Sequence, residues 1–168
     1  MSLLRRMFGF NVAIRPKVWD ASVIIVAAGA IAWMAIASVL PSSLWLEVRS
    51  VYVSDTVAGD VPLMQVDRTI HADVRGEYRV EVQRFERGGW LNICAGEGRA
   101  NYHHDAVLPD PLTLDWWTYP ATCSPSLTPG RYRIETRWTL FPDIAPPREV
   151  RVLSNIFTVS PPIVVPTE

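Results

Sequence analysis

An uncharged apolar run near the N-terminus constrains this chain more than any other feature. The run comprises residues 21–40 and contains no Asp, Glu, Lys or Arg. A helix of this length rises about 30 Å, which matches the thickness of the hydrocarbon core of a bilayer. Lipid offers no hydrogen-bond partner to backbone amides and carbonyls, so a segment that crosses it must be helical. We therefore expect one transmembrane helix over 21–40, ended by Pro41, which lacks an amide hydrogen.

Charged residues around this run predict its orientation. The preceding segment, residues 1–20, carries Arg5, Arg6, Arg15 and Lys17. Charges of both signs follow the helix, so the positive-inside rule places residues 1–20 in the cytoplasm as a basic tail. Trp19 and Trp45 flank the run, where indoles favour the headgroup boundary, so we expect both to contact the lipid bilayer there. The pattern is typical of a bacterial inner-membrane protein with a periplasmic C-terminal domain.

A cleaved signal peptide is the alternative to an anchor. Residues 35–37, Ala-Ile-Ala, have the small-residue spacing of a signal-peptidase site. The apolar run is longer than a usual signal core, however, and the basic region before it is also long. We therefore favour an uncleaved anchor.

Residues 46–160 have the period-two pattern of β-strands. In 131–140, largely apolar residues alternate with polar and charged ones, which predicts a strand with one buried and one solvated face. Other strand-like runs are 46–54, 66–74, 78–82, 91–95, 112–119 and 149–159. Apolar parity switches between Val152 and Phe157, which predicts a bulge near Ser154. About seven short strands without a helical period favour an all-β fold, an antiparallel β-sandwich.

Segments on either side of this predicted sandwich are short. Residues 41–45 read as a linker from the helix, and the Pro-rich residues 161–168 as a flexible tail. The chain carries 16 basic and 17 acidic residues, a net charge of −1. This balance lacks the basic footprint of a nucleic-acid binder, so we expect no nucleic-acid partner.

One local motif refines the fold prediction. Residues 127–132, Leu-Thr-Pro-Gly-Arg-Tyr, resemble the turn and tyrosine that enter a late strand of immunoglobulin-like and fibronectin-type domains. The resemblance implies an immunoglobulin-like sandwich in which the Tyr132 hydroxyl is tied to the preceding turn. The resemblance predicts the fold and does not predict the function. The cysteines depart from that family, because Cys123 lies before the turn. The whole chain is also similar to small membrane-anchored proteins encoded by phages or prophages.

Cys94 and Cys123 both lie in the segment predicted to be exported. An exported domain meets an oxidising compartment, so we expect the two to form a disulfide. Closing a loop of about thirty residues stabilises a fold by roughly 3–4 kcal/mol in the chain-entropy picture. Two buried free thiols are the alternative.

Catalytic and cofactor signatures are absent from the sequence. The most prominent polar cluster is His103, His104 and Asp105, but adjacent histidines in an extended chain point to opposite faces. A metal site would need further ligands, such as His71 or Asp110. We assign no catalytic, cofactor or metal residue and do not expect an enzyme. A small metal-dependent hydrolase built around the two histidines is kept as an alternative.

An aromatic segment, residues 112–119, is the predicted contact surface. As a strand it would bury Leu112, Leu114 and Trp116 and turn Trp117 and Tyr119 outward beside Thr113 and Asp115. Exposed Trp and Tyr are favoured at interfaces because they bury a large area at low entropy cost. The leading hypothesis is therefore a membrane-anchored binding or assembly module with a protein partner in the membrane or periplasm. The alternatives are self-association and a phage-encoded factor that acts on the host envelope, in lysis or superinfection exclusion.

Overall fold

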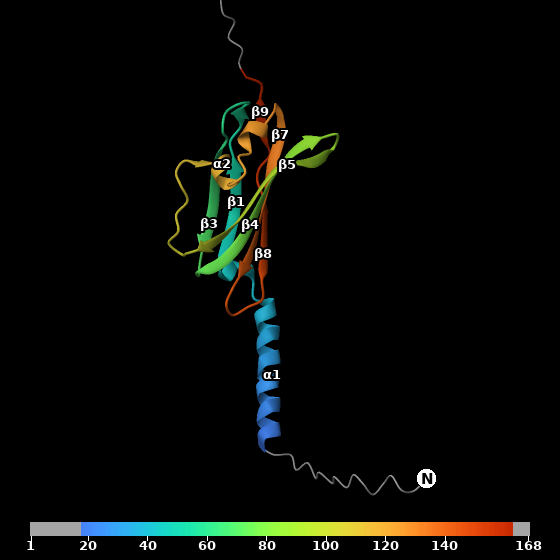
Figure 1. Ribbon diagram of the computed structural model, residues 1–168, viewed down its shortest axis with the longest axis vertical. Coiled ribbons are helices and arrows are strands. Elements are labelled where there is room, and N and C mark those ends of the chain that lie inside the picture. The colour runs from blue at the N-terminus through green and yellow to red at the C-terminus, as the bar shows by residue number, and fades with distance from the viewer. Residues whose placement is uncertain (1–17, 163–168) are drawn as a thin grey trace, which may run out of the picture. The chain divides into compact units, whose positions relative to one another are not determined.

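The structure is a computed structural model that describes residues 18–162, with side chains from residue 21 (Figure 1). The basic residues of the N-terminal tail and residues 163–168 of the C-terminal tail lie outside the described residues. The chain divides into two compact units after Val39.

Helix α1 spans Val18–Val39 and has 22 residues, a length of about 33 Å. It is the one helix in residues 18–162 that is long and apolar enough to cross a membrane, over Ala21–Val39. A membrane anchor and a signal sequence share these properties, so orientation and compartment stay predictions. Trp19 belongs to this helix, but its side chain lies outside the described residues.

The second unit is built mainly of β-strands in two sheets (Figure 1). The smaller sheet has the order β1–β3–β6, with the bounds Leu46–Val53, Leu63–Ile70 and Leu112–Thr113. The larger sheet has the order β2–β9–β7–β4–β5, with the bounds Thr56–Val57, Phe157–Ser160, Gly130–Phe141, Val74–Glu86 and Gly89–Tyr102. Strand β8, Arg148–Leu153, also pairs with β7. The β-sandwich is confirmed at this coarse level, but β2 and β9 run parallel, so the larger sheet is mixed.

Alternation along the strands produces the core between the sheets. Strand β7 buries Tyr132, Ile134, Trp138 and Leu140, as its period-two pattern predicts. These side chains meet buried residues of the other strands, among them Val53, Val80, Val82, Phe157 and Val159. Burying each such side chain stabilises the fold by about 1.5–3 kcal/mol.

One asparagine joins the two sheets along their shared side. The Asn155 side chain accepts a hydrogen bond from the Val53 amide at 2.7 Å and donates one to the Val53 carbonyl at 2.9 Å. After β1 the chain crosses to the larger sheet, where the Thr158 amide donates to Asp55 at 2.6 Å. At this edge of β1, the amide and carbonyl of Val53 are therefore hydrogen-bonded to a side chain and not to a neighbouring strand.

The bulge predicted near Ser154 is present. Between the paired residues of β8 and β9, three residues, 154–156, face only two residues of β7. The Ser154 hydroxyl accepts from the Ile134 amide at 2.8 Å, and the Ser154 amide donates to the Ile134 carbonyl at 2.8 Å. The extra residue switches the parity of the chain, so Val152 and Phe157 can both face inward.

The hydroxyl tie expected at Tyr132 is also present. Its Oη donates to the Thr128 carbonyl at 2.6 Å and accepts from the Thr128 amide at 3.1 Å. The ring is fully buried and stacks on Phe157 with centroids 5.7 Å apart. The predicted disulfide between Cys94 and Cys123 is formed as well, joining β5 to the segment before η2, Ser124–Ser126.

The outer face of the larger sheet carries a charged network. Glu135 accepts from Arg137 at 2.8 Å and from Arg151 at 2.7 Å, and its side chain is only 5 % exposed. These two hydrogen bonds lower the pKa of the Glu135 carboxyl, with Arg151 contributing most. The carboxylate is thus held charged beneath two arginine side chains.

Two predictions about local structure are wrong. Residues 112–119 are not one strand, because β6 ends at Thr113 and a short helix, α2, follows over Leu114–Trp117. A 3-10 helix, η1, spans Ser42–Leu44 within residues 41–45, and a helix this short is compatible with the expected linker. Trp45 does not stand free at a lipid boundary, since its side chain is 7 % exposed and packs in the core of the β-rich unit.

Candidate binding pocket

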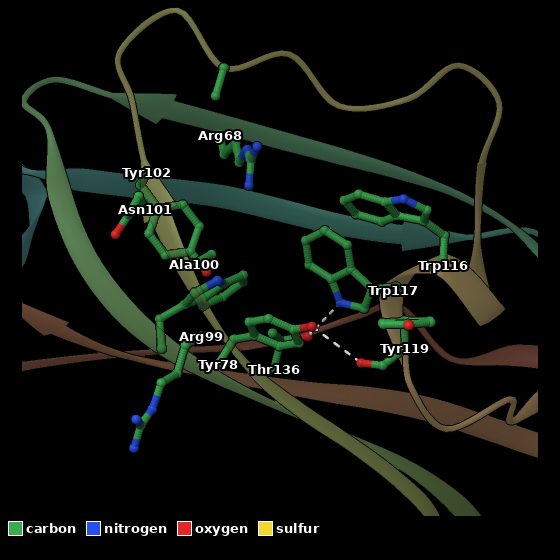
Figure 2. Close-up of a pocket in the computed structure, with 12 residues that line it drawn as sticks. Arg68, Tyr78, Arg99, Ala100, Asn101, Tyr102, Trp116, Trp117, Tyr119 and Thr136 are labelled. Carbon is green, nitrogen blue, oxygen red and sulfur yellow. Dashed lines mark hydrogen bonds between the residues drawn. The ribbon is translucent and has the colours of Figure 1, made fainter.

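A pocket of about 490 Å³ opens in the β-rich unit between strands of the two sheets and the α2 segment (Figure 2). Its volume lies within the range of small-molecule and cofactor sites, about 300–1,000 Å³. Six of its lining residues are aromatic: Tyr78, Tyr102, Trp116, Trp117, Tyr119 and Trp138. The pocket is therefore mainly apolar, with a few polar groups at fixed places.

Buried rings form the inner wall of the pocket. Trp117 packs edge-on against Trp138, with ring centroids 6.0 Å apart at 74°. The Trp117 indole nitrogen donates to the Thr136 hydroxyl at 3.0 Å, which fixes the ring orientation (Figure 2). Burial raises the pKa of Tyr102 to about 12, so its phenol stays neutral at physiological pH. The wall is thus formed before any ligand binds.

Exposed rings form the rim. Trp116 is 51 % exposed and Tyr119 is 69 % exposed. The Tyr78 hydroxyl donates to the Tyr119 carbonyl at 3.2 Å, which ties the rim to strand β4 (Figure 2). Such rigid, half-exposed aromatic side chains are the ones enriched at binding surfaces.

Local sequence explains why the rim lies so close to β5. A Cβ atom at Gly96 would lie 1.9 Å from the Thr118 carbonyl oxygen, so only glycine allows this approach. A Cβ atom at Gly98 would lie within 3.0 Å of the Tyr78 ring. The disulfide from Cys94 to Cys123 holds the same pair of segments together two residues earlier on β5. Glycine and cysteine at alternate positions thus place the rim segment on one face of the strand.

One cation reaches the pocket from the smaller sheet. Arg68 of β3 is half buried, and its guanidinium carbon lies 5.9 Å from the centroid of the Tyr102 ring. Burial lowers the pKa of this guanidinium. Among the described residues, Arg68 forms no ion pair with a carboxylate. Arg99, the other arginine of the lining, instead pairs with Glu77 at 2.9 Å and is 86 % exposed.

Of the four predicted interface residues, the structure brings two to this pocket. Trp117 and Tyr119 both line it, but Trp117 is buried at 6 % exposure instead of pointing outward. Helical spacing turns Leu114 and Trp117 to the same side, so Trp116 takes the exposed position. Thr113 caps α2 by accepting from the Trp116 amide at 3.3 Å. Asp115 accepts from the Ser124 amide at 2.8 Å and from the Ser124 hydroxyl.

The two histidines of the predicted polar cluster share one carboxylate. Asp73 lies 3.1 Å from Nδ1 of His103 and accepts from the His104 amide at 3.0 Å. These bonds, His103 first, lower the pKa of Asp73 to about 2. His71 pairs elsewhere, with Glu47 at 3.3 Å. Within the described part of the chain, no three His, Cys, Asp or Glu residues are grouped as metal ligands.

Comparisons with known proteins identified no relative of this chain. No protein-family model matches the chain, and no curated protein or solved structure matches it.

Proposed function

We propose that this protein is a membrane-tethered binding module of the bacterial inner membrane. In this proposal α1 is an uncleaved anchor, and the β-rich unit lies in the periplasm, where it binds a protein partner. The aromatic pocket is the binding site, and it is the observation that carries the proposal.

Preorganisation of the pocket supports a binding role. Its inner rings are held by the Trp117–Thr136 hydrogen bond and by packing against Trp138. Side chains that are ordered before binding lose less conformational entropy when a partner arrives. Trp116 and Tyr119 then offer exposed aromatic area around a fixed cavity. Buried aromatic anchors surrounded by such a rim contribute most of the affinity in many interfaces.

Export is supported by the disulfide and by the apolar helix. The Cys94–Cys123 bond is of a kind that persists in oxidising compartments. A helix with an apolar surface over Ala21–Val39 has the length required to cross a bilayer. Basic residues before it favour a cytoplasmic N-terminus.

We also propose that the sandwich is immunoglobulin-like. The tie between Tyr132 and Thr128 supports this arrangement. So does the path of the N-terminal strands, which leave the smaller sheet after β1 and pair in parallel with β9 through β2. No observation on the described residues favours the alternative functions, a phage-encoded envelope factor or a metal-dependent hydrolase.

Site-specific photo-crosslinking tests the proposed site. A benzophenone amino acid is placed at Trp116 or Tyr119 of the full-length protein in living cells. The matched control position is Tyr52, which is 52 % exposed but does not line the pocket. We expect a discrete protein adduct from the two rim positions and none from Tyr52. Equal adducts at all three positions, or none at any, would contradict a partner-binding site here.

A further inference from the structure

Arg68 carries a charge that the described residues do not balance. Taking a guanidinium out of water is unfavourable unless an anion or hydrogen-bond acceptors replace the water. Arg49 and Arg99 are more exposed than Arg68, yet each pairs with a carboxylate, Arg49 with Asp67 at 3.1 Å and Arg99 with Glu77 at 2.9 Å. Arg68 instead lies half buried against the Tyr102 ring, at the wall of an open pocket. A bound anion would supply the missing partner.

The charge of the lining indicates what kind of anion fits. Twelve residues line the pocket, and they include two arginines and no carboxylate. Because Arg99 is already paired and mostly exposed, one guanidinium is free to face a ligand. A single guanidinium matches a single carboxylate, with two parallel N–H···O hydrogen bonds. Figure 2 shows Arg68 above the opening that Tyr102, Trp116 and Trp117 surround, where the rest of such a ligand would lie.

An unpaired strand edge borders the same pocket. Strand β5 ends the order of the larger sheet and pairs only with β4 among the described strands. Its last four residues, 99–102, all contribute to the lining of the pocket. An exposed edge offers backbone amides and carbonyls to an extended peptide, which can add to the sheet as another strand.

We propose that the pocket binds the C-terminal aromatic residue of a partner protein, with its ring among Trp116, Trp117 and Tyr102 and its terminal carboxylate on Arg68. The residues before it extend along the free edge of β5. This inference rests on the proposed function and adds the chemistry of the partner. A C-terminal aromatic residue carries a carboxylate, an aromatic ring and an extended backbone. These three groups match the Arg68 guanidinium, the aromatic lining of the pocket and the unpaired edge of β5.

Peptide binding to the full-length protein in lipid nanodiscs tests the inference. The probe is a short fluorescein-labelled peptide that ends in phenylalanine with a free carboxylate. One matched peptide ends in the amide and another ends in alanine. We expect the carboxylate peptide to bind at least about tenfold more tightly than the amide, as for a charge-assisted hydrogen bond. The alanine peptide should lose the contribution of the ring and bind more weakly as well.

Arginine variants locate the charge recognition. Arg68→Gln should remove the preference for carboxylate over amide, and Arg68→Lys should keep part of it. Arg131→Gln is the matched control, because Arg131 stacks 5.4 Å from the Phe85 ring and does not line the pocket. This control should bind both peptides as the parent does. Methylating alternate backbone amides of the peptide should weaken binding in one register only, as strand addition requires.

Several results would overturn the inference. If the parent protein binds the carboxylate and amide peptides equally well, the inference is overturned. This comparison needs no variant, so it remains decisive even if Arg68→Gln fails to fold. Binding of free phenylacetate as tightly as the peptide would show that a small acid, not a chain terminus, is the ligand. No binding of any probe, together with crosslinks at Trp116 or Tyr119, would refute the terminus and leave the proposed function standing. Peptide binding without crosslinks in cells would instead remove support for the proposed cellular partner while the chemistry holds.

Discussion

The Tyr132 hydroxyl offers a direct test of how the β-rich unit is held together. Tyr132→Phe removes one oxygen and with it the two short hydrogen bonds, to the Thr128 carbonyl and from the Thr128 amide, as well as a longer contact of 3.4 Å with the Thr128 hydroxyl. The ring stays, so its stacking on Phe157 and its contact with Arg84 are kept. At ~1 kcal/mol net for each hydrogen bond, we expect the free energy of unfolding to fall by about 2 kcal/mol.

Urea unfolding of the full-length protein in detergent, followed by tryptophan fluorescence, measures this loss. With a denaturant slope of about 2 kcal/mol per molar, the unfolding midpoint should fall by about 1 M. Tyr52→Phe is the matched control, since Tyr52 is exposed on β1 and should shift the midpoint by less than about 0.3 M. If the two variants unfold at the same urea concentration, the tie does not stabilise the fold and the reasoning is refuted.

Three further predictions concern charge and covalent structure. Glu135→Gln weakens the contacts to two arginines and should destabilise the fold by about 1–3 kcal/mol, whereas the exposed Glu149→Gln should cost less than about 1 kcal/mol in the same urea assay. The pKa of Asp73 is lowered to about 2, so its stabilising contribution is present above pH 4 or so and is lost as the pH falls toward 2. Acid titration should therefore show Asp73→Asn losing less stability than the parent over that window, and equal curves would contradict the Asp73–histidine contacts. Replacing Cys94 and Cys123 together by alanine should cost roughly 3–4 kcal/mol, and an unchanged urea midpoint would show that the bond adds no stability.

Period-two alternation predicted the long strands well. In β7 the buried residues alternate along the strand because both its neighbours and the opposite sheet require it. The prediction of one strand over residues 112–119 was wrong because the apolar positions fit both the strand period and the helical period. Leu112 and Leu114 suggested a strand, while Leu114 and Trp117 are spaced as on one face of a helix. The Thr113 hydroxyl, a helix N-cap, was the local signal that separates these readings.

Charged residues that tertiary contacts bury were the harder part to predict. Glu135 has the parity of the solvated face of β7, yet it is buried by contact with Arg137 and Arg151. Arg68 has the parity of the core in β3, two residues from Val66 and from Ile70. That position was a signal for an inward cation, but only the tertiary structure shows that aromatic rings surround it. The sequence therefore led to Tyr119 and Trp117 and missed Arg68.

The disulfide and Gly96 have a further consequence for where binding can occur. The wall of the pocket that carries Trp116 and Tyr119 belongs to a segment held to β5 by the Cys94–Cys123 bond and by the close approach at Gly96. In a reducing compartment the covalent link is absent, and only the noncovalent contacts hold this wall in place. In the function that we propose, binding would therefore depend on the redox state of the surroundings. A chain whose Cys94 and Cys123 are still reduced would lack the covalent tether of this wall, so the binding that we propose would be weaker until the disulfide forms.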